Sequence, residues 1–271
     1  MIDVGIITGS GIYALTGSPE KHTVQTRFGS VEVEVSRRGP RAVGSISRHG
    51  EGHRNLPHTI PHQANLAALH ELGARAVLAT TAVGAVDPEL PLGRPLLFDD
   101  LFFPENRLPD GAACTMFPEP GEEGRGHLIQ TEPYAPALRR RMSLAAEDLG
   151  LEATLGGVYG HVNGPRFNTA AEIRHLSAAG VSAVSQTCGP ESVLAGELEL
   201  PYALAGFPVN HALGDPENGE SADDLAHLLA LSAQTLPRLL LHTAETLREE
   251  DLTSGHGYVY RVEGGIGRPA T

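Results

Sequence analysis

The order of strand and helix signals is the feature that most constrains the fold of this chain. Val4 to Thr8 (VGIIT) is a short β-branched run that stops at the glycine turn Gly9-Ser10-Gly11, as a buried strand followed by a tight turn does. Similar runs recur along the chain and alternate with segments that carry helix start signals. Such alternation is typical of a mostly parallel sheet with helices on both faces. The sequence therefore predicts an α/β fold, a single domain with a mixed, largely parallel central sheet flanked by helices.

The same signals predict the remaining strands and helices. Residues 31–36 alternate apolar and polar side chains at period two and form a predicted hairpin with residues 41–47. A capping box begins a helix at Thr169, and Pro237 is expected to kink the longest helix. The other predicted strands span residues 76–82, 96–100, 183–186 and 202–209, and the predicted helices span residues 61–72, 169–180, 191–198 and 221–248.

No internal repeat and no linker divides the first 250 residues. We therefore expect residues 1–250 to form one domain. Residues 104–126 are rich in Pro, Gly and Glu and predict a mobile loop. Residues 251–271 are expected to form an irregular C-terminal tail.

Composition excludes several classes of function. The chain has 271 residues, with 20 Lys and Arg against 33 Asp and Glu, and a formal net charge of −13. An acidic chain without a Lys/Arg-rich run is a poor nucleic-acid binder. No apolar run of about 20 residues predicts a transmembrane helix, and the start MIDVGIITGSG lacks the basic region of a signal peptide. Two cysteines fit a reducing compartment. We expect a soluble cytoplasmic enzyme without nucleic-acid or membrane partners.

The turn Gly9-Ser10-Gly11 is the first candidate binding site. Glycines let backbone N–H groups approach an anion closely, and Ser10 adds a hydroxyl donor. The turn is not a dinucleotide fingerprint, because Ala14 stands where GxGxxG needs its third glycine. A tight turn that binds no ligand remains an open alternative.

Arg48 and His49 follow a predicted strand and form the second candidate. Arginine offers a planar fork for phosphate oxygens and histidine a neighbouring donor, although a solvated pair at a strand end has the same sequence. Two HxxxH spacings, ending at His53 and His62, raise the question of a metal site. Prolines interrupt any helix that would align these pairs, and no HExxH glutamate is present. We expect no metal.

Three further candidates lie at or near predicted strand ends. They are residues 164–168, which include Phe167 and Asn168, residues 185–191, and Asn210. In parallel sheets ligands bind beyond the carboxyl ends of the strands, so the shared placement favours one site. Cys188 could act as a nucleophile, but no His-Asp order accompanies it, which favours a buried inert thiol.

Taken in order, these segments resemble the trimeric nucleoside phosphorylases, which include purine nucleoside, methylthioadenosine and methylthioinosine phosphorylases. The resemblance rests on VGIITGSGIY, SRHGEGH, LPHTIPHQANLAALHELGARAVLATTAVGAV, GPRFNTAAEIRHLSAAGVSAVSQTCGPE and VNHALG, which occur in family order between about Val4 and Leu240. It implies a nucleoside phosphorylase-like domain over residues 1–250, in a homotrimer or hexamer with the active site at the subunit interface. It also implies phosphorolysis of an N-glycosidic bond, which gives a free base and ribose 1-phosphate or its 5-modified analogue, with inorganic phosphate as co-substrate and no cofactor.

The resemblance also implies roles for individual residues. The phosphate-binding positions are Ser10, Arg48, His49, Thr81 and Thr187, with Ala82 as a backbone contact. The sugar-binding positions are Phe167, Gln186 and His127, the last reaching into the neighbouring subunit's site. The base-binding positions are Asn210 and Asn168.

The expected preference for one class of purine base depends on Asn210. Adenosine-type members have aspartate at this position, whereas an amide can donate to the 6-oxo group or N7 of hypoxanthine or guanine. We therefore expect a preference for 6-oxopurines, with 5′-methylthioinosine, inosine or guanosine as substrates. Asn168 stands where oxopurine-specific members carry glutamate, and Gln186 replaces a methionine. These departures leave a methylthioadenosine-type or a repurposed phosphorylase open.

Two readings from other classes also stay open. The histidine-rich segment could belong to a metal-dependent hydrolase, which would cleave its substrate without phosphate. The departures at Asn168 and Gln186 could instead mark a nucleoside-binding module without turnover.

Overall fold

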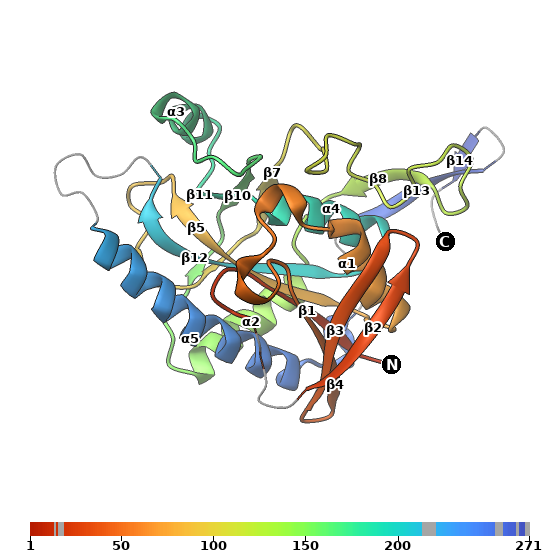
Figure 1. The fold of residues 1–271 in the computed structure, drawn as a ribbon, viewed down its shortest axis with the longest axis horizontal. Helices are drawn as coiled ribbons and strands as arrows, with labels where there is room; N and C mark the ends of the chain where they lie inside the picture. The colour runs from red at the N-terminus through yellow and green to blue at the C-terminus, as the bar shows by residue number, and fades with distance from the viewer. Residues whose placement is uncertain (14, 16–18, 213–220, 253–256, 264–265, 269–271) are drawn as a thin grey trace.

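The computed structural model describes residues 1–13, 15, 19–212, 221–252, 257–263 and 266–268. Ala14 and the end of the VNHALG motif lie outside these residues, as does the remainder of the C-terminal tail. One mixed sheet dominates the fold (Figure 1). The predicted α/β architecture with a mixed, largely parallel sheet is confirmed.

The large sheet has a continuous order of eight strands and a side branch. The order is β2 (Glu20–Thr26), β3 (Gly29–Arg38), β4 (Arg41–Ser47), β1 (Val4–Thr8), β5 (Val77–Ala85), β11 (Ala183–Ser185), β10 (Val158–His161) and β7 (Asp100–Phe102). The branch consists of β12 (Tyr202–His211), which pairs with β5, and of β6 (Leu96–Leu97) and β9 (Thr154–Leu155). β1 is parallel to both β4 and β5, and β12 is parallel to β5, while β11 is antiparallel to β5.

Five α-helices are described: α1 (His62–Glu71), α2 (Pro136–Asp148), α3 (Ala170–Ala178), α4 (Cys188–Glu197) and α5 (Ala222–Thr246). Three short 3₁₀ helices, η1 (Glu51–His53), η2 (Pro57–Thr59) and η3 (Glu249–Leu252), lie in connecting segments. The capping boxes at Thr169 and Ser221 are both present, so the sequence located the starts of α3 and α5 well. α4 begins three residues earlier than predicted, because a proline in the first turn is tolerated.

Period-two alternation along the central strands divides the core between two faces. Ile7 of β1 packs into a cluster with α1 and α4, whereas Val4 and Ile6 pack into a second cluster with α2 and α5. Leu204 and Phe207 of β12 are divided in the same way. Figure 1 shows α2 and α5 on one side of the sheet and α1 and α4 on the other. A smaller cluster lies under α3.

Several elements differ from the prediction. The predicted strand 96–100 is two short strands, β6 and β7, and α2 was not predicted. Residues 104–126 hold one isolated bridge, and Leu108, Cys114 and Met116 are buried in the core. That segment is therefore anchored by its apolar side chains, which the Pro- and Gly-rich composition concealed.

The expectation of an irregular C-terminal tail is wrong where this region is described. β13 (Gly257–Glu263) pairs antiparallel with β8 (Gly126–Gln130), and β14 (Ile266–Arg268) pairs with β13. Val259 is buried against the rest of the protein. The alternating run GYVYRVE carries this strand, and flanking glycines masked it. None of the described helices has the length and apolar character needed to cross a membrane.

Gly206 on β12 permits the packing beneath the centre of the sheet. A Cβ at this position would lie 2.5 Å from Cε2 of Phe98, whose side chain is fully buried. We predict that Gly206→Ala lowers the free energy of unfolding by about 1–3 kcal/mol, because the buried ring must shift. Urea denaturation measures the change. Arg140→Ala, on the exposed side of α2, is the control and should stay within about 0.5 kcal/mol of wild type. Equal stability of Gly206→Ala and wild type would contradict the packing described.

Candidate active site

The central sheet opens beside β5. β1 pairs with β5 through Ala79, and β11 begins to pair with β5 only at Gly84. Among the described strands, the edge of β5 at residues 80–83 therefore faces the gap between β1 and β11. Ligands in α/β proteins bind where neighbouring strands diverge in this way. The turn after β1, the segment after β4 and the N-terminus of α4 all meet at this opening.

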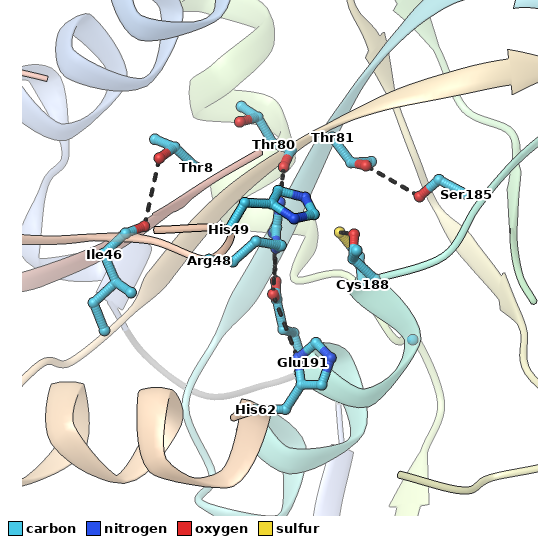
Figure 2. A network of polar contacts seen from close by, with 12 residues as sticks. Thr8, Ile46, Arg48, His49, His62, Thr80, Thr81, Ser185, Cys188 and Glu191 are labelled. Carbon is cyan, nitrogen blue, oxygen red and sulfur yellow. Dashed lines mark hydrogen bonds and ion pairs between the residues drawn. The ribbon is translucent and has the colours of Figure 1, made fainter. Parts of the chain in front are cut away.

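Arg48 directly follows β4 and contacts β5 beside this gap, and it is 1% exposed. Its Nε donates to Oε1 of Glu191 at 2.6 Å and its Nη2 donates to Oε2 at 2.7 Å. Its Nη1 donates to the carbonyl oxygen of Thr80 at 2.6 Å (Figure 2). A guanidinium has five N–H groups, so these contacts leave one N–H on each terminal nitrogen. The sequence alternative of a solvated arginine at a strand end is excluded.

Gly9 brings the first candidate turn close to Arg48. A Cβ on Gly9 would lie 3.0 Å from the carbonyl oxygen of Thr80 and 3.1 Å from Nη1 of Arg48. A side chain there would press on buried backbone and on the guanidinium. Thr8, just before the turn, donates from its hydroxyl to the carbonyl oxygen of Ile12 at 2.8 Å. The glycine is thus needed for the approach of the turn to the arginine, and half-buried Ser10 follows directly.

His49 lies next to Arg48 and is 4% exposed. Its Nδ1 is 2.8 Å from the carbonyl oxygen of Asn55, which can only accept, so Nδ1 carries the hydrogen. Burial and the adjacent charge of Arg48 lower the pKa of His49 to about 4. The ring of His53 stacks on it with centroids 4.1 Å apart. His49 is therefore a fixed neutral imidazole near neutral pH.

A chain of hydroxyl groups connects β5 to the start of α4. Thr81 Oγ1 lies 3.0 Å from Ser185 Oγ, which lies 2.7 Å from the hydroxyl of Tyr159. The backbone N–H of Cys188 donates to the Tyr159 hydroxyl at 3.0 Å. Thr187 precedes α4, is 4% exposed and makes no capping hydrogen bond. Its hydroxyl and the positive end of the α4 dipole are therefore placed to attract an anion.

The residues expected at the sugar and base are arranged on surrounding loops. Gln186 Nε2 donates to the carbonyl oxygen of Arg166 at 2.8 Å, which ties β11 to the loop that carries Phe167 and Asn168. Phe167 is 89% exposed in the single chain. Asn168 lines a cavity of about 480 Å³ that also includes Arg166 and His161. The half-buried Asn210 donates from Nδ2 to the carbonyl oxygen of His211 at 3.1 Å.

His127 is separate from this cluster. It lies on β8 in the three-stranded sheet, exposed to solvent, and lines a second cavity of about 450 Å³ with Glu197. None of the other predicted site residues lines that cavity. The structure therefore brings together Ser10, Arg48, His49, Thr81 and Thr187 within one chain, but not His127.

The alternative chemistries find little support in the described residues. Cys188 is fully buried, and burial raises the pKa of its thiol to about 11, as an inert thiol requires. Within the described part of the chain, no group of three or more His, Cys, Asp or Glu side chains could hold a metal ion.

Sequence reasoning missed the residues behind the site. Ser185 and Glu191 were noted only as part of the segment 185–191, and Tyr159 and Tyr202 were not selected. The one available signal was an acidic residue in the first turn of a helix of mostly small and apolar residues, and the structure buries eight of the ten residues of α4. Its partner Arg48 is 143 residues away in the chain, and no local pattern predicts that contact.

The fold and the hydrogen-bond donors around Arg48 define an α/β protein with its candidate site at an edge of the central sheet. Residues 3–245 match the family model of the phosphorylase superfamily, and the chain belongs to that family. The match confirms the resemblance drawn from the ordered motifs.

Named relatives cover most of the chain. It is 35% identical over 256 residues to the probable 6-oxopurine nucleoside phosphorylase of Thermococcus kodakarensis, covering 91% of this chain and 93% of that protein. It is 38% identical over 232 residues to the probable S-methyl-5′-thioinosine phosphorylase of Methanopyrus kandleri, covering 84% and 86%. The solved methylthioadenosine phosphorylase of Schistosoma mansoni in complex with adenine superimposes with a TM-score of 0.81 at 25% identity, covering 90% and 91%.

His62 makes the acid stability of the site testable. It lies under Glu191, and neither of its ring nitrogens has a hydrogen-bond partner among the described residues. Burial, then the charges of Arg48 and His49, lower its pKa from 6.5 to about 3. The unfolded chain therefore takes up this proton first as the pH falls, so the histidine destabilises the fold increasingly below about pH 6.5.

We predict that His62→Leu makes the free energy of unfolding less sensitive to acid. The dependence should decrease by about 1.4 kcal/mol per pH unit between pH 6 and 4, the contribution of one proton. Denaturant titrations at several pH values measure it. His70→Leu, on the exposed side of the same helix, is the control and should keep the wild-type dependence. Identical pH profiles for His62→Leu and wild type would contradict the burial of a neutral His62.

Proposed function

We propose that the chain catalyses phosphorolysis of the N-glycosidic bond of a purine nucleoside. The products are the free base and ribose 1-phosphate or its 5-modified analogue, so the enzyme is a pentosyltransferase of the purine nucleoside phosphorylase type. One observation supports this most strongly: buried Arg48 uses only three of its five N–H groups on Glu191 and Thr80, and it lies against the glycine turn after β1. The names of the relatives agree with this activity.

In this proposal the opening beside β5 holds inorganic phosphate as co-substrate, and no cofactor takes part. Arg48, Ser10, His49, Thr81 and Thr187 surround the anion, and the backbone at Ala82 lies on the open edge of β5. The phosphate oxygen attacks C1′ while the bond from C1′ to the purine nitrogen breaks and its electron pair leaves with the base. Little covalent chemistry is asked of the protein, so the main contributions are in-line positioning and stabilisation of charge.

The net charge of −13 does not prevent phosphate binding. Exposed carboxylates more than about 8–10 Å away are mostly screened at physiological ionic strength. A unit charge about 4 Å away, at an effective dielectric constant near 20, contributes roughly 4 kcal/mol. The local donors of Arg48, Thr187 and the α4 N-terminus therefore decide the sign of the interaction.

Asn210 is proposed to read the purine. Its Nδ2 is engaged by the carbonyl oxygen of His211, which leaves Oδ1 as the acceptor available to a bound base. Negative charge develops on the purine as it leaves, and a base protonated at N7 can donate to Oδ1. Rotation of the amide would instead offer N–H to a 6-oxo group, because the two ends of an amide differ only in orientation. We propose that 6-oxopurine nucleosides, inosine, guanosine or 5′-methylthioinosine, are preferred.

The sugar is proposed to lie beside the loop 164–168. Phe167 supplies an apolar face, and Asn168 and Gln186 are the polar neighbours. A methylthioadenosine-type activity is the alternative, because relatives such as that of Mycolicibacterium smegmatis, 38% identical over 208 residues, are named S-methyl-5′-thioadenosine phosphorylase.

We also propose a homotrimer, or a hexamer built from trimers, in the cytoplasm. Phe167 is 89% exposed and His127 stands apart from the Arg48 cluster in the single chain. A neighbouring copy that covers Phe167 and contributes its own His127 would give both residues a place at the site.

The proposed reaction is tested by its requirement for phosphate. Inosine and 5′-methylthioinosine should be converted to hypoxanthine only when phosphate or arsenate is present, because the anion is the nucleophile. Chromatography of the base and of the sugar phosphate measures the products. Guanosine, adenosine and 5′-methylthioadenosine complete the substrate panel. Equal rates in phosphate-free buffer would identify a hydrolase, and tight nucleoside binding without any product would identify a binding module.

The role of Asn210 in base recognition is tested by a substitution that changes only the amide nitrogen of its side chain to oxygen. Asn210→Asp replaces the amide with a carboxylate, which can only accept, so the preference should shift towards 6-aminopurines. The expected shift in the inosine-to-adenosine ratio of kcat/KM is about ten- to a hundredfold, the effect of one mismatched buried hydrogen bond. Gln25→Glu, the same chemical change on the exposed strand β2, is the control. An unchanged ratio in Asn210→Asp would remove Asn210 from base recognition.

A further inference from the structure

Glu191 is a fully buried carboxylate that the proposed reaction has not so far used. Its side chain has 0% exposure, as does that of its partner Arg48. Both carboxylate oxygens accept from Arg48, and the hydroxyl of Tyr202 also donates to Oε2 at 3.0 Å. Nδ1 of His62 lies 3.7 Å from Oε1. The donors around Glu191, from Arg48 and Tyr202, thus lie behind the proposed phosphate site.

The geometry of this pair fixes the arginine. Two parallel N–H···O bonds hold the guanidinium plane in line with the carboxylate, and the bond to the carbonyl oxygen of Thr80 prevents rotation about that edge. The two remaining N–H groups, one on Nη1 and one on Nη2, are therefore fixed in position together with the guanidinium plane. Glu191 lies in the first turn of α4, where the helix dipole favours a negative charge.

The pair also fixes the charge of the opening. The positive charge of Arg48 is matched by Glu191, and the neighbouring His49 is neutral near pH 7. In the proposed reaction, phosphate interacts with the oriented N–H groups of Arg48 and with a helix N-terminus. The positive charge of Arg48 is already balanced by Glu191. An unbalanced buried arginine would attract any anion strongly and hold it whatever its orientation.

We infer that Glu191 is a positioning residue of the reaction. It orients Arg48 and weakens the attraction of Arg48 for phosphate. The anion is then held in the orientation that in-line attack on C1′ requires. This inference rests on the proposed function, in which phosphate lies against Arg48. Glu191 touches neither phosphate nor nucleoside and acts only through the guanidinium.

Two variants distinguish the effect of the negative charge of Glu191 from the effect of the position of its side chain. Glu191→Gln removes the countercharge and turns one acceptor into a donor that opposes Arg48. The unbalanced arginine should then bind phosphate about tenfold more tightly, while kcat falls about 10- to 100-fold because the guanidinium is misplaced. Glu191→Asp keeps the charge on a shorter side chain, so kcat should fall while phosphate binds no more tightly than in wild type.

The measurements are the phosphate dissociation constant from calorimetry, kcat and the KM values for phosphate and nucleoside, and the rise in melting temperature on adding phosphate. Thr243→Val is the control, since it removes one fully buried hydrogen bond, to the carbonyl oxygen of Leu239 on α5, and touches neither Arg48 nor Glu191. It should destabilise the protein and leave phosphate affinity and kcat within about threefold of wild type, as a residue with only a structural role does. Arg48→Ala is not a useful variant, because it leaves Glu191 as a buried charge without its partner.

The outcomes distinguish the inference from the function on which it rests. Wild-type protein that binds no phosphate would overturn the proposed function itself. Wild-type protein that binds phosphate, with Glu191→Gln binding it no more tightly, would overturn the inference. If Glu191→Gln does not fold, Glu191→Asp decides, because wild-type kcat in that variant would equally overturn the positioning role.

Discussion

The buried ion pair between Arg48 and Glu191 is the interaction on which the rest of the site depends. It joins the end of β4 to the first turn of α4, and through Thr80 and Tyr202 it also reaches β5 and β12. A charge without its partner at this depth would cost several kcal/mol, so the four elements are constrained to a single arrangement. The two N–H groups that remain on Arg48 are a consequence of that arrangement.

A gap in the pairing of the central sheet lies beside this pair. β1 leaves β5 after Ala79 and β11 joins only at Gly84, so the backbone edge of β5 at residues 80–83 faces a gap between these two strands. Gly9 allows the first turn to approach the arginine, and the start of α4 faces the same space. Hydrogen-bond donors from separated segments thus lie close together in a chain of net charge −13.

The sequence predicted those parts of the fold that local physics determines. The strand at Val4–Thr8 and the caps at Thr169 and Ser221 follow from side-chain pattern and capping chemistry. The strand β13 and the helix α2 were missed, because each is stabilised mainly by what it packs against. Burial of the loop 104–126 has the same origin, since its three buried side chains find the core only in the folded protein.

For the candidate site, the sequence led to the selection of Arg48 and of the residues expected around it, but not of those that hold Arg48 in place. Arg48 and Thr187 were selected from their motifs and from a family resemblance. Glu191 could not be selected, because an acidic residue after Gly-Pro reads as a helix start and its partner is 143 residues away. The neutral state of His49 likewise depends on burial and on a backbone carbonyl that no pattern reveals.

A crystal structure of the protein grown with phosphate, or with sulfate as its mimic, tests the central claim most directly. The account predicts tetrahedral density beside the two unused N–H groups of Arg48, within hydrogen-bond distance of Thr187 and the turn at Ser10, with the Arg48–Glu191 pair intact. An opening filled by side chains, or an anion bound only elsewhere on the molecule, would contradict it.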